Sequence, residues 1–358
     1  MKQTIGFGLH LPIIKFKGVA DHSRQQILSF AKKAENLDYD YLGVNDHIVF
    51  RTTNWLDALT TLSAVAAVTS KIKVGTSILN VVVRNPIVCA KALTGIDILS
   101  SGRLFAGVGP GSYKGDYDVC GIAFEDRWKR FEEALQVLNL LWEQESENEV
   151  DYNGHYYKFK KVVVAPRPFQ KPHPPILIGS WGSSEPGLRR VAKYGDGWMA
   201  SAYNITPDKF EKWKTLLSYR KDMGKDTTRF GNYLVSMFGY IDNNKEKIHK
   251  MVKDVLSPAL GRPADELESF LLFGSVDDCI KKIKAFPEAG VNSIHFWPVN
   301  NYIEQIELFS KEIIYSFRYA VDRLRNRKAV QFQTKRALSI YLWRAYKSIQ
   351  SYLDLNRN

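Results

Sequence analysis

Residues 72–109 read IKVGTSILNVVVRNPIVCAKALTGIDILSSGRLFAGVG and predict a strand, a helix and a second strand in turn. The apolar runs Ile72–Leu79 and Leu104–Val108 have the length and composition of buried strands. Between them, Asn85-Pro86 begins a helix that continues through Leu99, because proline is favoured in the first helical turn. Parallel strands need a crossover connection of this kind, so the stretch indicates one unit of a parallel α/β sheet.

The same alternation of short apolar runs and longer amphipathic segments extends along most of the chain. The eight predicted strands are Thr4–Leu9, Tyr39–Asn45, Ile72–Leu79, Leu104–Val108, Pro175–Gly179, Gly197–Ala200, Tyr233–Ile241 and Ser293–Pro298. Gln25–Asn36 and Trp55–Val68 carry apolar residues at helical spacing, and Ser275–Asp278 forms a capping box for a helix that ends near Phe286. Eight strand–helix repeats in about 315 residues predict a (β/α)8 TIM barrel rather than an open doubly wound sheet.

Two long insertions follow predicted strands. Pro110–His173 contains a predicted helix at Phe124–Gln144 and a predicted hairpin at Val150–Val164, and the second insertion runs roughly from Asp242 to Phe273. Barrel enzymes build their sites from the loops that follow the strands, so both insertions are expected at the rim of the active-site mouth.

The positive charge is concentrated at the C-terminus. Residues 319–358 hold nine Lys or Arg and two Asp, and so carry +7 of the net charge of +12. We predict two parts, a barrel over 1–318 and a basic amphipathic extension over 319–358, where Ala337–Leu353 has helical spacing. The extension could fold back on the barrel, pack on a second subunit of a homo-oligomer, or lie on an anionic membrane, which is the least favoured interpretation. Since the excess charge lies in this appendage, no nucleic-acid partner is expected.

Several classes of protein do not fit the sequence. No apolar stretch approaches the ~18 to 20 residues of a membrane span, and the N-terminus lacks a secretory pattern, so we expect a cytoplasmic protein. Cys89, Cys120 and Cys279 lie far apart, which disfavours a disulfide framework and a zinc site, and no metal site is predicted. Neither a P-loop nor a nucleophile elbow is present.

A polar pair, Asp46-His47, directly follows the second predicted strand. Polar side chains at that end of a barrel strand face the active-site mouth. The imidazole could transfer a proton near neutral pH, and Asp46 could orient it or cap the next helix. The alternative is a capping loop with a structural histidine.

Glycine-rich loops follow the fourth and fifth strands and precede the sixth. Glycines let the backbone approach a planar ligand or a phosphate, and the unpaired N–H groups at the start of the helix Pro186–Tyr194 could hold an anion. Ordinary tight turns are the alternative. The candidate cofactor-binding residues in these loops are Gly109, Ser112, Gly179, Ser180, Gly182, Ser183, Gly197 and Trp198.

Taken in order, these motifs resemble the bacterial-luciferase-like flavin-dependent oxidoreductases. The resemblance covers about residues 3–315 and excludes the basic extension. It is carried by Gly43-Val44-Asn45-Asp46-His47, Val74-Gly75-Thr76-Ser77, Arg84-Asn85-Pro86, Asp97–Leu104, Ala165-Pro166-Arg167-Pro168 and Asp196-Gly197-Trp198, among others.

The resemblance implies that a flavin or deazaflavin binds at the C-terminal mouth of the barrel. Its ring would lie over the third strand near Thr76, Ser77 and Ile78, where members of the family often carry a non-prolyl cis peptide. The phosphate end would lie on Gly179–Ser183 and near Gly197. Members that oxidise sugar phosphates with coenzyme F-420 have a carboxylic acid where this chain has Ser112, which argues against that substrate class.

The function implied first is that of a reduced-flavin-dependent oxidoreductase, a monooxygenase that uses reduced FMN, oxygen and a small organic substrate, with a flavin reductase as its partner. His47 would manage protons, and Thr76 and Ser77 would contact the ring. Two alternatives stay open: hydride transfer with the deazaflavin coenzyme F-420, and non-catalytic flavin binding.

Overall fold

The structure is a computed structural model that describes residues 5–15, 23–50, 54–143, 148–181 and 184–318. The chain divides into two compact units, residues 1–313 and 314–358, and only 314–318 of the second unit are described. The predicted extension over 319–358 lies outside the described residues, so its boundary and its helix stay predictions.

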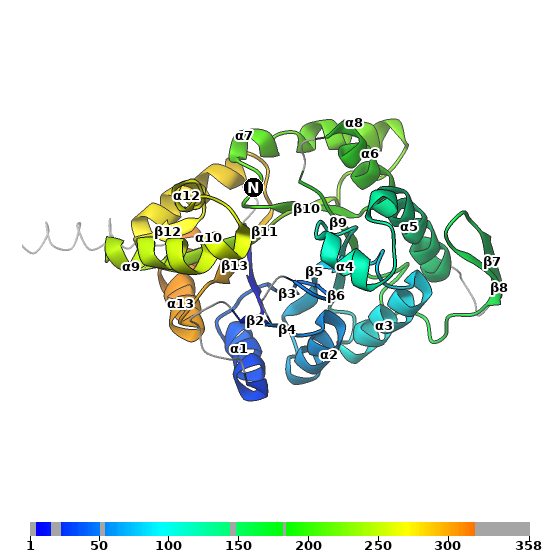
Figure 1. Ribbon diagram of the computed structural model, residues 1–358, viewed down its shortest axis with the longest axis horizontal. Helices are drawn as coiled ribbons and strands as arrows, with labels where there is room; N and C mark the ends of the chain where they lie inside the picture. The colour runs from blue at the N-terminus through cyan, green and yellow to red at the C-terminus, as the bar shows by residue number, and fades with distance from the viewer. Residues whose placement is uncertain (1–4, 16–22, 51–53, 144–147, 182–183, 319–358) are drawn as a thin grey trace, which may run out of the picture. The chain divides into compact units, whose positions relative to one another are not determined.

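Eight parallel strands close into a barrel, which confirms the predicted (β/α)8 fold (Figure 1). The strands follow one another around the barrel in sequence order, and pairing of β13 with β1 closes the ring. They are β1 (Gly6–His10), β3 (Tyr41–Val44), β5 (Lys73–Asn80), β6 (Leu104–Gly109), β9 (Ile176–Gly179), β10 (Gly197–Ser201), β11 (Gly231–Ile241) and β13 (Ser293–Pro298). Strands β6, β9, β10 and β13 are buried along their whole length, as expected for parallel strands covered on both sides.

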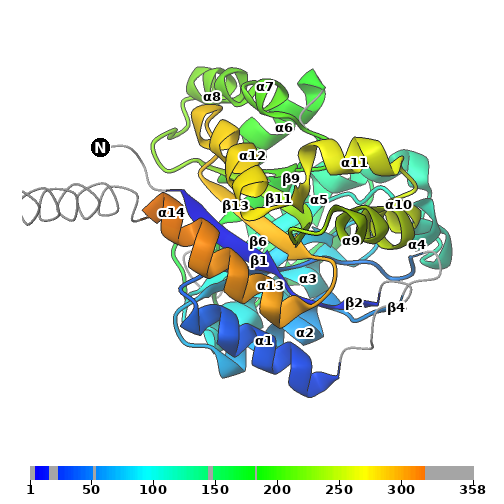
Figure 2. The same ribbon diagram turned by 90° about the vertical axis from the view of Figure 1, so that its left-hand side faces the viewer.

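Helices surround the strands, and α13 lies beside α1 where the outer ring closes (Figure 2). The helices of this ring are α1 (Arg24–Asn36), α2 (Ala58–Val68), α3 (Pro86–Leu99), α5 (Arg127–Glu143), α6 (Glu185–Tyr194), α8 (Trp213–Asp222), α12 (Val276–Glu288) and α13 (Tyr302–Leu308). The helix predicted inside the first insertion is α5, which contacts both α3 and α6. It is therefore the barrel's own fourth helix.

The remaining elements decorate the barrel. After β6 come α4 (Lys114–Val119), the 3-10 turn η1 (Phe124–Asp126) and the predicted hairpin, β7 (Val150–Asn153) with β8 (Lys158–Val162). After β11 come α9 (Lys245–Lys250), the π-helical turn η2 (Met251–Leu256), α10 (Ser257–Leu260), α11 (Ala264–Phe270) and β12 (Leu272–Gly274). The others are β2 (Ile14–Lys15), β4 (Asn54–Trp55), α7 (Pro207–Phe210), the π-helical turn η3 (Phe309–Ile314) and α14 (Tyr315–Arg318).

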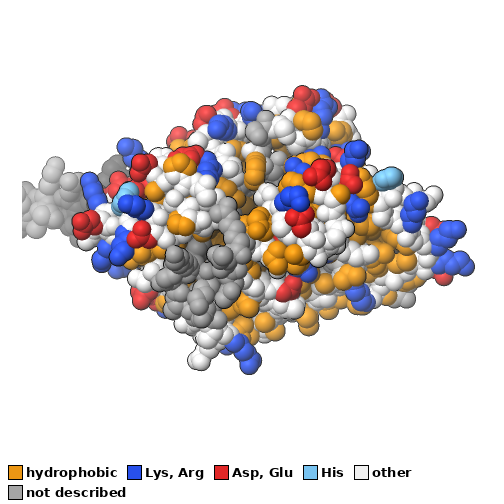
Figure 3. Space-filling view, in the orientation of Figure 1, with side chains coloured by type: hydrophobic (Ala, Val, Ile, Leu, Met, Phe, Trp, Pro, Cys, Tyr) orange, Lys and Arg blue, Asp and Glu red, His pale blue; other side chains and the backbone are white. Residues whose placement is uncertain are grey.

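The face seen in Figure 1 has hydrophobic side chains around its middle and along its lower right side, with Lys, Arg, Asp and Glu scattered among them (Figure 3). Within the described ranges, no helix is long and apolar enough to cross a membrane. Inside the barrel, Tyr41, Phe105, Met199 and Tyr233 form part of one buried cluster. Polar residues stand at or just after the strand ends, among them His10, Asn80 and Ser201, and these ends form the floor of the site.

Candidate active site

A cavity of about 500 Å³ opens where the barrel strands end. Its lining includes Asn45, Asp46 and His47 after β3, Ser77, Ile78 and Asn80 of β5, and Pro110, Gly111 and Ser112 after β6. The opposite wall includes Gly179, Ser180, Trp181, Ser184, Met199, Ser201, Tyr203, Val235 and Ser236, with Phe124, Arg127 and Trp128 from the first insertion. No residue of the second insertion, all of which is described, lines it.

Six of the predicted site residues line this cavity, namely Asp46, His47, Ser77, Ser112, Gly179 and Ser180. Gly182 and Ser183 lie outside the described residues. Thr76 does not reach the cavity, because its hydroxyl is buried and donates to the carbonyl oxygen of Gly107 at 2.7 Å, which joins β5 to β6. The Thr76 hydroxyl is therefore engaged within the barrel wall, and contact of its backbone with the ring stays a prediction.

Two further predicted ligands, Gly197 and Trp198, are also corrected. Gly197 begins β10 and pairs with Gly231 and Leu177, so it lies toward the opposite end of the strand from the cavity. Trp198 is fully buried, and its indole N–H donates to the carbonyl oxygen of Ser180 at 3.1 Å. It supports the Ser180 loop from behind rather than touching a ligand.

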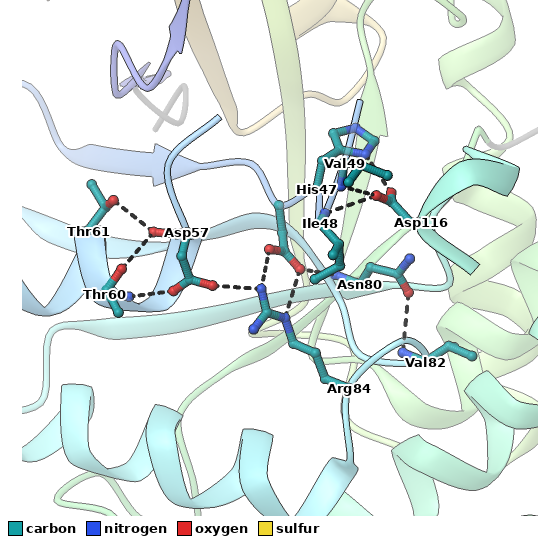
Figure 4. Close-up of polar contacts among 11 residues, drawn as sticks. His47, Ile48, Val49, Asp57, Thr60, Thr61, Asn80, Val82, Arg84 and Asp116 are labelled. Carbon is teal, nitrogen blue, oxygen red and sulfur yellow. Dashed lines mark hydrogen bonds and ion pairs between the residues drawn. The ribbon is translucent and has the colours of Figure 1, made fainter. Parts of the chain in front are cut away.

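His47 is held by a carboxylate that the sequence did not reveal (Figure 4). Its Nδ1 lies 2.7 Å from Oδ2 of Asp116, a residue of α4 with 1% of its surface exposed. The other oxygen of Asp116 accepts the backbone N–H groups of Ile48 and Val49, at 2.9 and 2.8 Å. Because a carboxylate accepts, Nδ1 carries the proton, and Nε2 is the ring nitrogen left for a ligand.

Asp46 was predicted to orient His47 or to cap the next helix, and it does neither. Its side chain is fully buried against Arg84, and Nη2 of Arg84 lies 2.7 Å from Oδ1 of Asp46. The same nitrogen lies 2.8 Å from Oδ2 of Asp57. Asp57 is the residue that caps α2, by accepting from the N–H of Thr60 (Figure 4). Burial raises the pKa of Asp46, and the Arg84 guanidinium opposes that rise.

The peptide bond between Ser77 and Ile78 is cis, at the place that the resemblance implied. The Ile78 side chain occupies the space beside two glycines: a Cβ on Gly109 or Gly179 would lie 2.2 or 2.5 Å from its Cδ1. Gly109 itself is absent from the cavity lining. These glycines therefore make room for Ile78 in the cavity wall. Gly179 also lines the cavity, and the approach of a phosphate to it stays a prediction.

The far end of the cavity has the features of an anion site. Helix α6 begins there, capped by Ser184, whose hydroxyl oxygen accepts from the N–H of Gly187. A Cβ on Gly187 would lie 3.0 Å from the hydroxyl oxygen of Ser184 and 3.2 Å from that of Ser180, so glycine keeps this corner open. Arg127 lines the same cavity and supplies a cation. These groups fit the phosphate of a flavin-type cofactor.

Sequence reasoning missed Asp116, Arg127 and the role of Arg84. Asp116 lies in the first insertion, where neither strand position nor a known motif marks it. Arg84 and Arg127 both belong to the stretches that carry the family resemblance, but those stretches do not reveal what the two side chains contact. Within the part of the chain that is described, no three His, Cys, Asp or Glu side chains gather in a way that could hold a metal ion.

With the site in view, comparison with known proteins decides the family. A sequence profile described as luciferase-like monooxygenase matches residues 15–293. The chain belongs to the luciferase-like monooxygenase family. It is thus a TIM-barrel protein of a family whose members are oxidoreductases, as the motifs predicted.

Curated relatives in the luciferase-like family align over different lengths. An uncharacterized protein of Mycobacterium tuberculosis is 34% identical over 153 residues, which are 43% of this chain and 52% of that protein. The chain therefore spans about half the length of this relative. An F-420-dependent glucose-6-phosphate dehydrogenase of Segniliparus rotundus is 26% identical, over 85% of this chain and 98% of that one.

Solved structures of similar fold include both an F-420-dependent dehydrogenase and a monooxygenase. An F-420-dependent secondary alcohol dehydrogenase, in complex with an F-420–acetone adduct, superposes with a TM-score of 0.74 at 20% identity and covers 87% of this chain and 98% of that one. A monooxygenase from Streptomyces bottropensis gives 0.72 at 19% identity, covering 87% and 100%. At these identities the likeness establishes the fold alone.

Proposed function

We propose that this protein transfers a hydride between the deazaflavin coenzyme F-420 and a small substrate that carries a hydroxyl or carbonyl group. The observation that carries the proposal is the His47–Asp116 pair in the wall of the cavity. The F-420-dependent relative that aligns over nearly its whole length supports the choice of cofactor.

The pair suits the proton transfer that alcohol oxidation requires. As the C–H hydrogen of an alcohol leaves with its electron pair, the O–H proton must go to a base, and the product is a carbonyl compound. Nε2 of His47 would take that proton, while Asp116, which holds the ring through Nδ1, would stabilise the imidazolium that forms. In the reverse direction the same nitrogen returns the proton to the oxygen.

The cavity has features that suit both ends of such a cofactor. Bound coenzyme F-420 supplies a two-electron hydride acceptor or donor. Ser77 and Ile78 would support its ring, and Ser180, Ser184 and Arg127 would hold its phosphate. Ser112, where the resemblance implies a carboxylic acid in sugar-phosphate dehydrogenases, favours a substrate other than a sugar phosphate.

A reduced-flavin monooxygenase is the second candidate. The supporting observation is that Ile78 and Met199 give the cavity an apolar wall, which would exclude water from a reactive site. In that case His47 would protonate or deprotonate the substrate or the oxygen-derived group, and a reductase would be needed to supply reduced FMN.

One titration separates the two candidates. Purified protein is mixed in turn with coenzyme F-420, FMN and reduced FMN, and ring fluorescence and oxygen consumption are followed. We expect F-420 to bind, no oxygen uptake above the rate of free reduced FMN, and bleaching of bound F-420 by one member of a panel of small alcohols.

Tight binding of reduced FMN with oxygen-dependent turnover of a substrate, and no binding of F-420, would establish the monooxygenase instead. Failure of all three to bind would refute both candidates.

A further inference from the structure

His10 is a buried histidine beneath the cavity that the proposed reaction does not use. It ends β1, and 1% of its surface is exposed. Its ring stacks on the indole of Trp297, with ring centroids 4.1 Å apart and planes 13° from parallel. The stack fixes the plane of the imidazole, so its two nitrogens have fixed neighbours.

The neighbour of Nε2 determines which nitrogen carries the proton. The backbone N–H of Ser236 donates to Nε2 at 3.1 Å. Ser236 lies where the register of β11 shifts, and it adopts φ +57°, a conformation that favours glycine. A backbone N–H can only donate, so Nε2 is the unprotonated nitrogen of the neutral ring, and the proton is on Nδ1.

The surroundings keep His10 neutral. Burial lowers the pKa of His10 well below its usual value, and nearby His295, with ring centroids 6.3 Å apart, lowers it further. A hydrogen bond with the Asn45 side chain opposes this shift. A neutral ring of fixed tautomer donates from Nδ1 at physiological pH.

With Nε2 taken by Ser236, Nδ1 is the nitrogen left for the side chains of Asn45 and Ser77, which both line the cavity. Ser77 is the one whose hydroxyl can change between donor and acceptor. Its hydroxyl oxygen lies 3.4 Å from Nδ1 of His10, at the long end of hydrogen-bonding distance. We propose that His10 is a positioning residue: its Nδ1–H occupies a lone pair of the Ser77 oxygen and turns the Ser77 O–H toward the cavity as a donor. The step from this geometry to a bound ligand rests on the proposed function.

The consequence is a chemical preference in the cavity floor. A serine hydroxyl can otherwise rotate and serve as donor or acceptor. With its oxygen engaged by His10, Ser77 favours a ligand atom that accepts a hydrogen bond, such as a carbonyl oxygen or unprotonated nitrogen on the edge of a planar ring. A ligand that presents only an N–H at this position is disfavoured.

The first test uses the ligand-free full-length protein. Long-range ¹⁵N–¹H correlation spectra of histidine-labelled protein distinguish the two tautomers, and the His10 signal is assigned by its loss in His10→Phe. We expect a neutral ring protonated at Nδ1 at neutral pH. Ser77→Ala should shift the Nδ1 resonances, and Ser201→Ala, which removes another serine of the same cavity, should leave them in place.

A ring protonated at Nε2, a charged ring at neutral pH, or equal shifts in the two serine variants would overturn the proposal. These outcomes need no ligand, so they are independent of whether any cofactor binds.

The second test is a double-mutant cycle on the affinity for FMN and for coenzyme F-420, measured by ring fluorescence. Ser77→Ala should weaken binding about five- to tenfold, the range for one hydrogen bond. His10→Phe, which keeps an aromatic ring against Trp297, should weaken it about fivefold alone and less than about twofold when Ser77 is already Ala. Equal losses in both backgrounds would overturn the proposal. If neither cofactor binds, the proposed function fails, and the spectra alone decide the role of His10.

Discussion

At the scale of single residues, the function of His47 depends on the carboxylate behind it. Asp116→Asn keeps the shape but offers an amide where Nδ1–H and two backbone N–H groups need acceptors. We expect kcat to fall by roughly tenfold to a hundredfold, with cofactor affinity changed by less than about threefold, because only proton transfer loses its oriented base. Steady-state kinetics and fluorescence titration measure the two effects.

Asp118→Asn is the matched control, since this exposed residue of α4 pairs with Lys114 and is not among the described residues that line the cavity. Its kcat should stay within about twofold of the wild-type value. Wild-type turnover in Asp116→Asn would mean that the pair is structural.

The buried ion pair between Asp46 and Arg84 gives a second prediction, on stability. Arg84→Met removes the cation and leaves the fully buried Asp46 carboxyl without it. Removing one partner of a buried pair typically costs ~3 to 5 kcal/mol of the free energy of unfolding, and 20% exposure of the Arg84 side chain places the loss here toward the lower end. Urea unfolding measures it.

Asp46→Asn combined with Arg84→Met should recover part of the loss, because the uncompensated charge is gone. A single variant as stable as the wild type would show that water or the neighbouring backbone satisfies Asp46 without Arg84.

These residues also show how far the sequence leads. His47 was predictable because the pair Asp46-His47 directly follows a predicted strand, and the C-terminal ends of barrel strands face the active-site mouth. Its partner Asp116 is 69 positions away, and only the folded chain brings the two together. The adjacent Asp46 was predicted to be this partner, yet it pairs with Arg84. A strand pattern does not reveal which side chains pair in this way.

At the scale of elements, the third strand depends on the glycines that face it. Gly179→Val would place a branched side chain where Cδ1 of Ile78 lies 2.5 Å from the ideal Cβ. Ile78 has to move, and its open side is the cavity. We expect cofactor affinity to fall by tenfold or more, about 1.4 kcal/mol, measured by fluorescence titration on protein whose folding is checked by circular dichroism.

Gly95→Ala in helix α3 is the matched control, because nothing lies within 4 Å of the new Cβ. It should leave affinity unchanged and raise the free energy of unfolding by ~0.5 to 1 kcal/mol, the usual gain from replacing glycine inside a helix. Unchanged affinity in Gly179→Val with an intact fold would mean that Ile78 does not form the cofactor's wall.

Elements were predictable where their signals are local. Helix α3 begins as predicted because Asn85 accepts from the N–H of Ile87, two residues away. Helix α12 does so because Ser275 and Asp278 cap each other. Strand β12 was missed: it has three residues, and its reason for being a strand is its pairing with Gly239–Ile241 of β11, far away in sequence.

At the scale of the whole molecule, two buried histidines couple stability to pH. Burial lowers the pKa of His295 to about 3, and it also lowers that of His10. In the unfolded chain both histidines take up protons near pH 6.5. Between that pKa and the lower pKa of the folded state, the unfolded chain binds more protons, so stability falls as pH falls. From pH 7 to pH 5 we expect His295 to contribute a loss of up to ~2 kcal/mol and His10 to act in the same direction, measured by urea unfolding.

His295→Leu should reduce the slope of stability against pH over this interval, with His155→Gln, a substitution at an exposed position, measured beside it for comparison. The same slope in His295→Leu as in the wild type would show that this histidine is already protonated in the native barrel.

Removal of the basic extension, residues 319–358, tests whether it contributes to the site. Among the described residues, those that line the cavity all lie between Asn45 and Ser236, and the first compact unit ends at residue 313. A chain that ends after Arg318 should therefore keep its cofactor affinity within about threefold at high salt. It loses +7 of the net +12, so its affinity for an anionic cofactor should fall more at low salt, where charges act over longer distances. Titration with the cofactor at two salt concentrations measures the affinity, and sedimentation measures the oligomeric state. A change from dimer to monomer with binding retained would support subunit packing by residues 319–358, and loss of binding at both salt concentrations would show that the extension is part of the site.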